Sequence, residues 1–162
     1  MSSKPKLIAS ALAISAAGLS FIASNEGIVT TADGKYATVY LDPVGIPTVC
    51  NGHTGKDLRV NTEVPIAVCD RLLATDTETA VKAVQRLVRV PITQAQFDSL
   101  VDFTFNVGAS AFAKSTLLKK VNAKDCRGAG AEFLRWKYAS GKELRGLVIR
   151  REQESALWMS GC

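Results

Sequence analysis

The chain has 162 residues, of which 47% are hydrophobic and 22% are charged, close to the average for one soluble globular domain. This composition excludes a disordered tail, a collagen-like fibre and a protein with several membrane spans. Twenty Lys and Arg residues against fifteen Asp and Glu residues give a net charge of +5, which suits an anionic partner but is equally explained by solubility alone.

The N-terminal segment is first basic and then uncharged. Lys4 and Lys6 precede nineteen residues, 7–25, that carry no charge, which is enough to span a bilayer. Eleven of the nineteen are Ala, Gly or Ser, so insertion into a membrane is weak. We interpret residues 1–25 as an uncleaved signal anchor, with residues 26–162 as a domain outside the cytoplasm. A cleaved signal peptide and a buried core helix are the alternatives.

The cysteines also indicate an oxidising compartment. Four cysteines are an even number, and the chain has no Cys-x-x-Cys pair and only one His, so we expect disulfides and neither a metal nor a cofactor. Cys50 ends an expected strand, and Cys69 lies early in the helix that follows. Cys126 begins a later helix, and Cys162 is the last residue. From these positions we predict the pairs Cys50–Cys69 and Cys126–Cys162.

A short β region is predicted after the N-terminal segment. Asp33-Gly34 separates two β-prone runs, 29–32 and 35–40, and this pattern is typical of a hairpin. A turn at 42–45 and a strand at 46–50 follow.

The remainder of the chain is predicted to be helical. Apolar residues recur at helical spacing from Pro65, placed in a first turn, to Pro91, which indicates one long helix or two that divide near Thr75. Thr93 and Gln96 form a capping box for a helix that Gly108 ends. Shorter helices are expected over 115–122, 125–136 and 147–159. The predicted fold class is α+β, with a small β-hairpin lobe, a connecting helix and a larger α-helical lobe.

Two carboxylates are candidates for glycoside hydrolysis. Glu26 follows the uncharged run, Asp42 ends the predicted hairpin, and Thr48 lies on the next strand. This chemistry needs one carboxylic acid that protonates the leaving oxygen and one carboxylate that activates water. Fifteen Asp and Glu residues offer many pairs, so Glu26 as a helix end and Asp42 as part of a turn is an open alternative.

The surroundings of these residues resemble the signature E-G…Y-x-D-x-x-G-x-x-T-x-x-x-G-H of phage lysozymes, the muramidase endolysins. Further similarity lies in 105–108, 112–118, Trp136 and 146–152, so the resemblance covers about residues 24–160. The residues that match the signature are Glu26, Gly27, Tyr40, Asp42, Gly45, Thr48, Gly52 and His53.

This resemblance implies a lysozyme-like fold with a cleft between the lobes. It implies a lysozyme that hydrolyses the β-1,4 bond between N-acetylmuramic acid and N-acetylglucosamine in peptidoglycan and lyses the host cell. Glu26 is then the general acid, and Asp42 and Thr48 position the attacking water in an inverting mechanism. His53 is implied to be structural.

Three residues of the helical part, Phe105, Asn106 and Ser115, match positions that line the substrate cleft of the family. For Phe105, packing in an apolar helix is an equal alternative.

The N-terminal segment resembles the signal-anchor-release element of the exported branch of the family. The enzyme is then tethered and inactive at the host inner membrane, facing the periplasm, before its release. After release, residues 7–25 are expected to form a helix that packs on the domain and brings Glu26 to the cleft. The expected partners are peptidoglycan glycan strands and the inner membrane, with a monomeric enzyme and no nucleic acid, because the basic residues form no dense patch.

The chain departs from the family in one spacing. Fifteen residues separate Glu26 from Asp42, more than the family usually has, and the surplus coincides with the Asp33-Gly34 hairpin. Asp33 is the competing carboxylate, but it lacks the Tyr, Gly and Thr neighbours of Asp42. The rival functions are a lytic transglycosylase that uses Glu26 alone and a non-enzymatic glycan-binding envelope protein.

Overall fold

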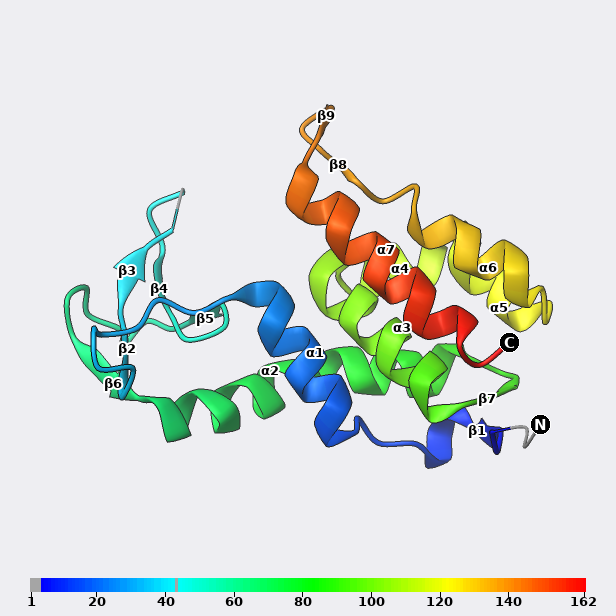
Figure 1. Ribbon diagram of the computed structural model, residues 1–162, viewed down its shortest axis with the longest axis horizontal. Helices are drawn as coiled ribbons and strands as arrows, with labels where there is room; N and C mark the ends of the chain where they lie inside the picture. Colours follow the sequence, from blue (N-terminus) through cyan, green and yellow to red (C-terminus); the bar gives the residue numbers. More distant parts are fainter. Residues whose placement is uncertain (1–3, 43) are drawn as a thin grey trace. The chain divides into compact units, whose positions relative to one another are not determined.

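The computed structural model describes residues 4–42 and 44–162, and its fold is α+β as predicted (Figure 1). The chain forms two compact units. Residues 19–78 make up one, here called the β unit, and residues 1–18 with 79–162 make up the other, here called the α unit. Pro43, in the predicted turn, and the first three residues of the predicted anchor lie outside the described residues.

The β unit is built from short antiparallel strands. A three-stranded sheet contains β3 (Tyr40–Leu41), β4 (Pro47–Val49) and β5 (His53–Thr54), and a second sheet pairs β2 (Tyr36–Thr38) with β6 (Glu63–Pro65). The unit has a small buried core that includes Ala37, Val39 and Val49 and the disulfide between Cys50 and Cys69.

The predicted hairpin is present only in part. The Asp33-Gly34 turn forms, with Gly34 in the left-handed region at φ 69°, but the arms share a single bridge, between Thr30 and Ala37. Strand β2 pairs mainly with β6 instead. Pro65 lies at the end of β6 rather than in a helical turn, because an edge strand tolerates a residue without an N–H.

The predicted long helix is one uninterrupted element, α2 (Ile66–Leu87). In the α unit, α3 (Gln94–Val107) is buried at nine consecutive residues, 96–104, and is therefore central to the packing. The other helices of this unit are α4 (Ala109–Lys114), α5 (Thr116–Asn122), α6 (Cys126–Phe133) and α7 (Arg145–Met159), and a hairpin joins β8 (Tyr138–Ala139) to β9 (Lys142–Glu143).

Local signals placed the boundaries of α3 correctly. Thr93 accepts a hydrogen bond from the N–H of Gln96, whose side chain accepts one from the N–H of Thr93, so the predicted capping box is confirmed. Gly108 ends the helix at φ 90°. Along the buried face, the ring of Phe103 makes edge-to-face contacts with Phe112, Phe133 and Trp136.

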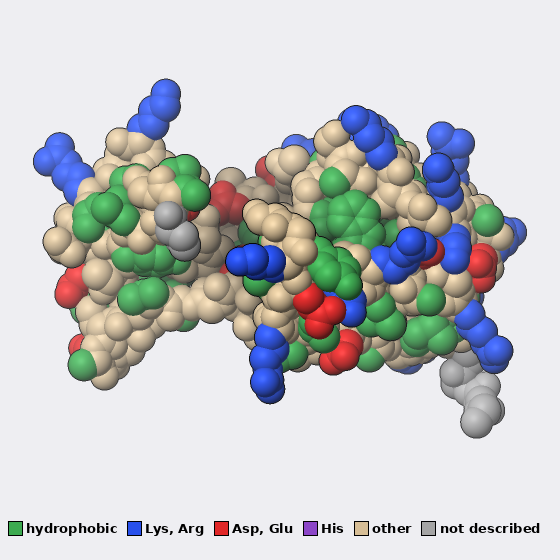
Figure 2. Space-filling model, turned by 90° about the horizontal axis from the view of Figure 1, so that it is seen from above, with side chains coloured by type: hydrophobic (Ala, Val, Ile, Leu, Met, Phe, Trp, Pro, Cys, Tyr) green, Lys and Arg blue, Asp and Glu red, His purple; other side chains and the backbone are tan. Residues whose placement is uncertain are grey.

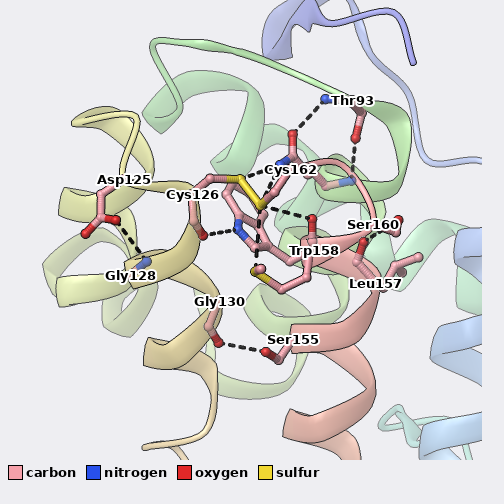
Figure 3. The surroundings of a disulfide bond; sticks show 12 residues. Thr93, Asp125, Cys126, Gly128, Gly130, Ser155, Leu157, Trp158, Ser160 and Cys162 are labelled. Atoms are coloured by element: carbon pink, nitrogen blue, oxygen red, sulfur yellow. Dashed lines mark hydrogen bonds between the residues drawn. A yellow bond between two sulfur atoms is a disulfide. The ribbon is translucent and has the colours of Figure 1, made fainter. Parts of the chain in front are cut away.

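The second disulfide joins Cys126, at the start of α6, to Cys162, the last residue (Figure 3). The indole N–H of Trp158 donates to the carbonyl oxygen of Cys126 at 2.8 Å, and Ser155 donates to Gly130 at 2.8 Å. The structure therefore contains both of the predicted cysteine pairs.

The N-terminal segment differs from the expectation of one helix over residues 7–25. It forms β1 (Leu7–Ile8), which pairs with β7 (Pro91–Ile92), then a 3-10 turn (Ala9–Ala11), and only then α1 (Ala16–Glu26). Leu7 and Ile8 are 50% and 59% exposed, so not all of the apolar residues pack on the domain.

The cause of the interruption is a tertiary contact at Ser15. Its N–H and hydroxyl donate to the carboxylate of Asp98 at 3.1 and 2.5 Å, and its hydroxyl oxygen accepts from the N–H of Gly18 at 2.9 Å. Ser15 thus caps α1 and fixes its first turn. Across residues 4–42 and 44–162, we find no helix with both the length and the apolar character that crossing a bilayer requires.

Candidate active site

Asp42 follows β3 and begins the turn that leads to β4. One carboxylate oxygen, Oδ1, accepts hydrogen bonds from the N–H groups of Val44 (2.9 Å) and Ile46 (2.8 Å). Asp commonly closes a turn in this way, by binding backbone N–H groups that follow it. The two bonds orient the partly buried carboxylate.

Thr48 lies in the middle of β4, opposite Tyr40 of β3. Its hydroxyl donates to the carbonyl oxygen of Ile46 at 3.0 Å and is almost fully buried. The N–H of Ile46 binds Asp42 and its C=O binds Thr48, so a single peptide segment fixes both side chains. The structure brings these two predicted residues together.

Glu26 is the last residue of α1, and Gly27, at φ 67°, ends the helix. A Cβ atom added to Gly52 would lie 3.9 Å from Oε2 of Glu26, so the Glu26 carboxylate lies against the turn between β4 and β5. Asp42 belongs to the turn at the other end of β4. A strand rises about 3.3 Å per residue, so these two turns are on the order of 10 Å apart.

His53, on β5, is hydrogen-bonded through Nδ1 to Oδ2 of Asp76, on α2, at 2.8 Å. The two side chains are 24% and 31% exposed. The pair links the sheet to the helix within the β unit. Asp76 was not singled out in the sequence, because nothing local relates it to a residue 23 positions away.

The competing carboxylate, Asp33, is used within its own turn. It accepts from the hydroxyl of Thr31 at 2.7 Å and from the N–H of Lys35 at 3.1 Å, and these bonds lower the pKa of its exposed carboxyl. The hydrogen bonds within its own turn therefore account for Asp33 without a catalytic role.

The three other predicted site residues lie in the α unit. The hydroxyl of Ser115 donates to the carbonyl oxygen of Phe112 and accepts from the N–H of Leu118, so this 4% exposed side chain caps α5, and its place in the substrate cleft stays a prediction. The side-chain oxygen of Asn106 accepts from Arg151, and Phe105 is partly buried on α3.

A buried charge cluster in the α unit was missed in the sequence. Arg150 donates to both carboxylate oxygens of Asp102 at 2.8 and 3.1 Å, and Arg151 donates to both oxygens of Glu154 at 2.6 Å. Burial, and then a hydrogen bond with Asp102, raise the pKa of Glu154 well above its usual value, while Arg151 opposes the shift. The signal in the sequence was the high number of charged residues in α7, since some of them fall on the face of the helix that is buried.

Two further features bear on the site. Within the described ranges, no three His, Cys, Asp or Glu side chains form a cluster that fits a metal ion.

On the face drawn in Figure 2, Lys and Arg side chains are dispersed among uncharged and acidic ones. This is not the continuous basic stripe that is typical of a nucleic-acid-binding surface.

Comparisons with known proteins identify the family of the chain. The phage lysozyme family matches residues 30–154. The chain is 47% identical to the SAR-endolysin of Escherichia phage Mu over 119 residues, which are 74% of this chain and 69% of that protein. It is 37% identical to the SAR-endolysin of Enterobacteria phage P21 over 150 residues, 91% of this chain and 88% of that one.

A solved structure shows the same fold. The crystal structure of a P22 lysozyme mutant has a TM-score of 0.80 and 35% sequence identity, and the match covers 91% of this chain and 99% of that one. The fold and the family match define a glycoside hydrolase of the lysozyme type. The chain belongs to the phage lysozyme family, which acts on peptidoglycan.

Proposed function

We propose that this lysozyme is an endolysin that hydrolyses the β-1,4 bond between N-acetylmuramic acid and N-acetylglucosamine and so lyses the host cell. Glu26 is the general acid, and Asp42 and Thr48 position the attacking water. The observation that carries the proposal is the arrangement along β4, with Asp42 and Thr48 both bonded to Ile46 near one end and Glu26 against the turn at the other.

The spacing supports an inverting mechanism. Inverting glycosidases separate their two carboxyl groups by about 6.5–9.5 Å, which leaves room for a water molecule beneath the sugar. Glu26 lies against the turn at one end of β4 and Asp42 belongs to the turn at the other, and the three residues of the strand span about 10 Å, which supports a carboxyl separation in this range. Asp42 accepts the proton of the water as its oxygen attacks the anomeric carbon, and Glu26 donates a proton to the leaving oxygen.

Thr48 suits a water-positioning role because of its own hydrogen bond. Its hydroxyl proton is donated to the carbonyl oxygen of Ile46, so the hydroxyl oxygen is left as an acceptor. A water between Asp42 and Thr48 then donates one hydrogen to each, which directs its lone pair toward the sugar.

We also propose regulation by tethering, because the N-terminal residues would serve both as a membrane anchor and as part of the folded enzyme. We infer that residues 1–25 are a signal anchor, which the names of the Mu and P21 relatives and the nineteen uncharged residues support. The same residues supply β1 and most of α1 to the folded protein. A chain anchored through 7–25 holds these residues in lipid, where α1 cannot make its contacts with the folded enzyme, so Glu26 lies at the surface of the host inner membrane and the enzyme is inactive until release into the periplasm.

The catalytic assignment is tested with Glu26→Gln and Asp42→Asn on purified cell walls. We expect each to reduce the rate by about 100-fold or more, with an unchanged unfolding temperature, because an amide cannot transfer the proton. Asp33→Asn is the matched control and retains most activity. Nearly full activity of Glu26→Gln, or opposite results for Asp42 and Asp33, would contradict the assignment.

The products provide a second check. Hydrolysis creates a new reducing end at each cut and, for an inverting enzyme, the α-anomer first. A 1,6-anhydro product without a reducing end would instead indicate a lytic transglycosylase, and binding without any cleavage would indicate a glycan-binding protein.

Tethering is tested by making the segment more apolar. Ala16, Ala17 and Ser20 are exposed, so Leu at these positions leaves the folded enzyme intact and deepens insertion by about 0.3–0.6 kcal/mol per Leu. Gly18 is left unchanged, because a Cβ there would lie 2.7 Å from Asp98. We expect the variant to stay in the membrane fraction and to delay lysis, while the protein purified without detergent remains active. Lysis at the normal time by a membrane-bound variant would refute the tether.

A further inference from the structure

Asn51 occupies the tight turn between β4 and β5. Its neighbours Cys50 and Gly52 both have left-handed backbone conformations, at φ 55° and 87°, and Cys50 is fixed to α2 by the disulfide to Cys69. A non-glycine residue in this region is strained, and such strain persists only where the surroundings impose it. Asn51 itself is only 8% exposed, so its side chain is directed into the β unit.

The side-chain amide of Asn51 bridges the two sides of Glu26. Its nitrogen donates to the carbonyl oxygen of Ala23, three residues before Glu26, at 3.3 Å, and to that of Gly27, one residue after it, at 3.1 Å. An amide nitrogen has two hydrogens, and both are used here. The last carbonyl groups of a helix lack partners within the helix, so a side chain that binds them fixes the end of the helix.

We propose that Asn51 is a positioning residue for Glu26, and this inference rests on the proposed role of Glu26 as the acid. One amide holds the backbone on both sides of Glu26, and Gly52 of the same turn lies next to the Glu26 carboxylate. The turn that carries Asn51 also follows directly on β4, which carries Thr48. Asn51 therefore sets the position of the acid relative to the strand of the water-binding residues.

The inference is tested with Asn51→Asp in the full-length protein, measured on purified peptidoglycan well below the unfolding temperature. The substitution preserves size and shape but places an oxygen opposite two carbonyl oxygens. We expect kcat to fall by about tenfold or more while KM stays within about twofold, because the groups that contact substrate are unchanged. Asn61→Asp makes the same chemical change at an exposed residue of the same unit and is expected to behave like the wild type.

A pH profile separates positioning from a general structural effect. At acidic pH the carboxyl introduced by Asn51→Asp is protonated and regains one donor, so kcat relative to wild type should rise there. Asn51→Ala, which never has a donor, should show no such rise. Hydrogen exchange gives a readout without catalysis: the N–H of Gly27, which donates to Ala23, should lose protection in Asn51→Asp.

A loss in kcat below about threefold, or a rise in KM at unchanged kcat, overturns the inference. If Asn51→Asp does not fold, Asn51→Ser, which retains one donor, is judged by the same criteria. Glu26→Gln in the same assay separates the two proposals. If it is inactive while Asn51→Asp resembles wild type, only the role of Asn51 fails, and if it is active, the assignment of Glu26 fails.

Discussion

The β unit and the α unit achieve defined structures by different means. In the β unit the strands have two or three residues, and six of the ten described residues with left-handed backbone lie there, in a unit of 60 residues. In the α unit the helices surround large, fully buried side chains such as Phe97, Phe103 and Leu117.

The β unit therefore positions the proposed catalytic residues, and the α unit provides most of the stability. Turns and individual polar contacts fix the backbone of the β unit, where Glu26, Asp42 and Thr48 lie. Burial of apolar area is the dominant favourable contribution to folding, and most of it is in the α unit. Substitutions in the α unit should therefore change the free energy of unfolding, and those in the β unit should change the rate per folded molecule.

The largest effect on stability is expected from Phe103→Ala. Phe103 is fully buried, contacts three aromatic rings and lies 4.9 Å from the guanidinium of Arg151, so its removal leaves a cavity. We expect a loss of about 3–5 kcal/mol in the free energy of unfolding, measured by denaturant titration. Val49→Ala in the β unit is the comparison and should cost less. Equal losses would contradict the division of stability between the units.

The two disulfides give the next test. Closing loops of 19 and 36 residues contributes about 3 and about 4 kcal/mol respectively through loss of unfolded-state entropy. Replacing Cys126 and Cys162 by Ala should lower the unfolding temperature without changing kcat. Replacing Cys50 and Cys69 should also lower kcat of the folded fraction, because Cys50 precedes Asn51. Equal specific activities of the two double variants would argue against this distinction.

A smaller effect is expected from Asp76→Asn. The substitution removes the charged acceptor of His53 and should reduce the free energy of unfolding by about 1–2 kcal/mol, since the pair is partly exposed. Asp70→Asn, on an exposed position of the same helix, should change it by no more than about 0.5 kcal/mol. If both variants unfold at the same denaturant concentration, the bond to His53 makes no measurable contribution.

The last test is a pH dependence in the α unit. The pKa of Glu154 is raised in the folded protein, so its contribution to stability is present at acidic pH and is lost as the pH rises through the folded value. In Glu154→Gln that loss is absent, so the stability of the variant relative to wild type should increase with pH. Because only one proton is involved, the slope of this stability difference against pH cannot exceed about 1.4 kcal/mol per pH unit.

Exposed Glu152 on the same helix provides the control. Glu152→Gln makes the same chemical change at this exposed position and is measured over the same pH range. A stability difference between Glu154→Gln and wild type that is constant from acidic to neutral pH would show that Glu154 titrates normally.

Much of the fold followed from local signals. The capping box at Thr93, the end of α3 at Gly108 and the long helix α2 depend on residues that are close in the sequence, and the structure contains all three. Both cysteine pairs were also predicted, because the elements that carry them were correctly ordered. For the site, the predicted Asp42 and Thr48 share the segment at Ile46.

The errors have a common physical origin in distant contacts. The start of α1 is set by Ser15 and Asp98, which are 83 residues apart, and no local pattern records that pair. The partner of His53 and the bridge from Asn51 to Ala23 are of the same kind.

The contact between Gly18 and Asp98 limits how the N-terminal segment can evolve. This position has no room for a side chain, since a Cβ would lie 2.7 Å from the Asp98 carboxyl, and Ser15 donates two hydrogen bonds to that carboxyl. A segment proposed to serve in lipid and in water must therefore keep small and polar residues where the aqueous fold needs them. The fold therefore excludes larger apolar residues at Gly18 and disfavours them at Ser15, and a tighter anchor would have to be gained at positions such as Ala16 and Ala17, which the fold leaves exposed.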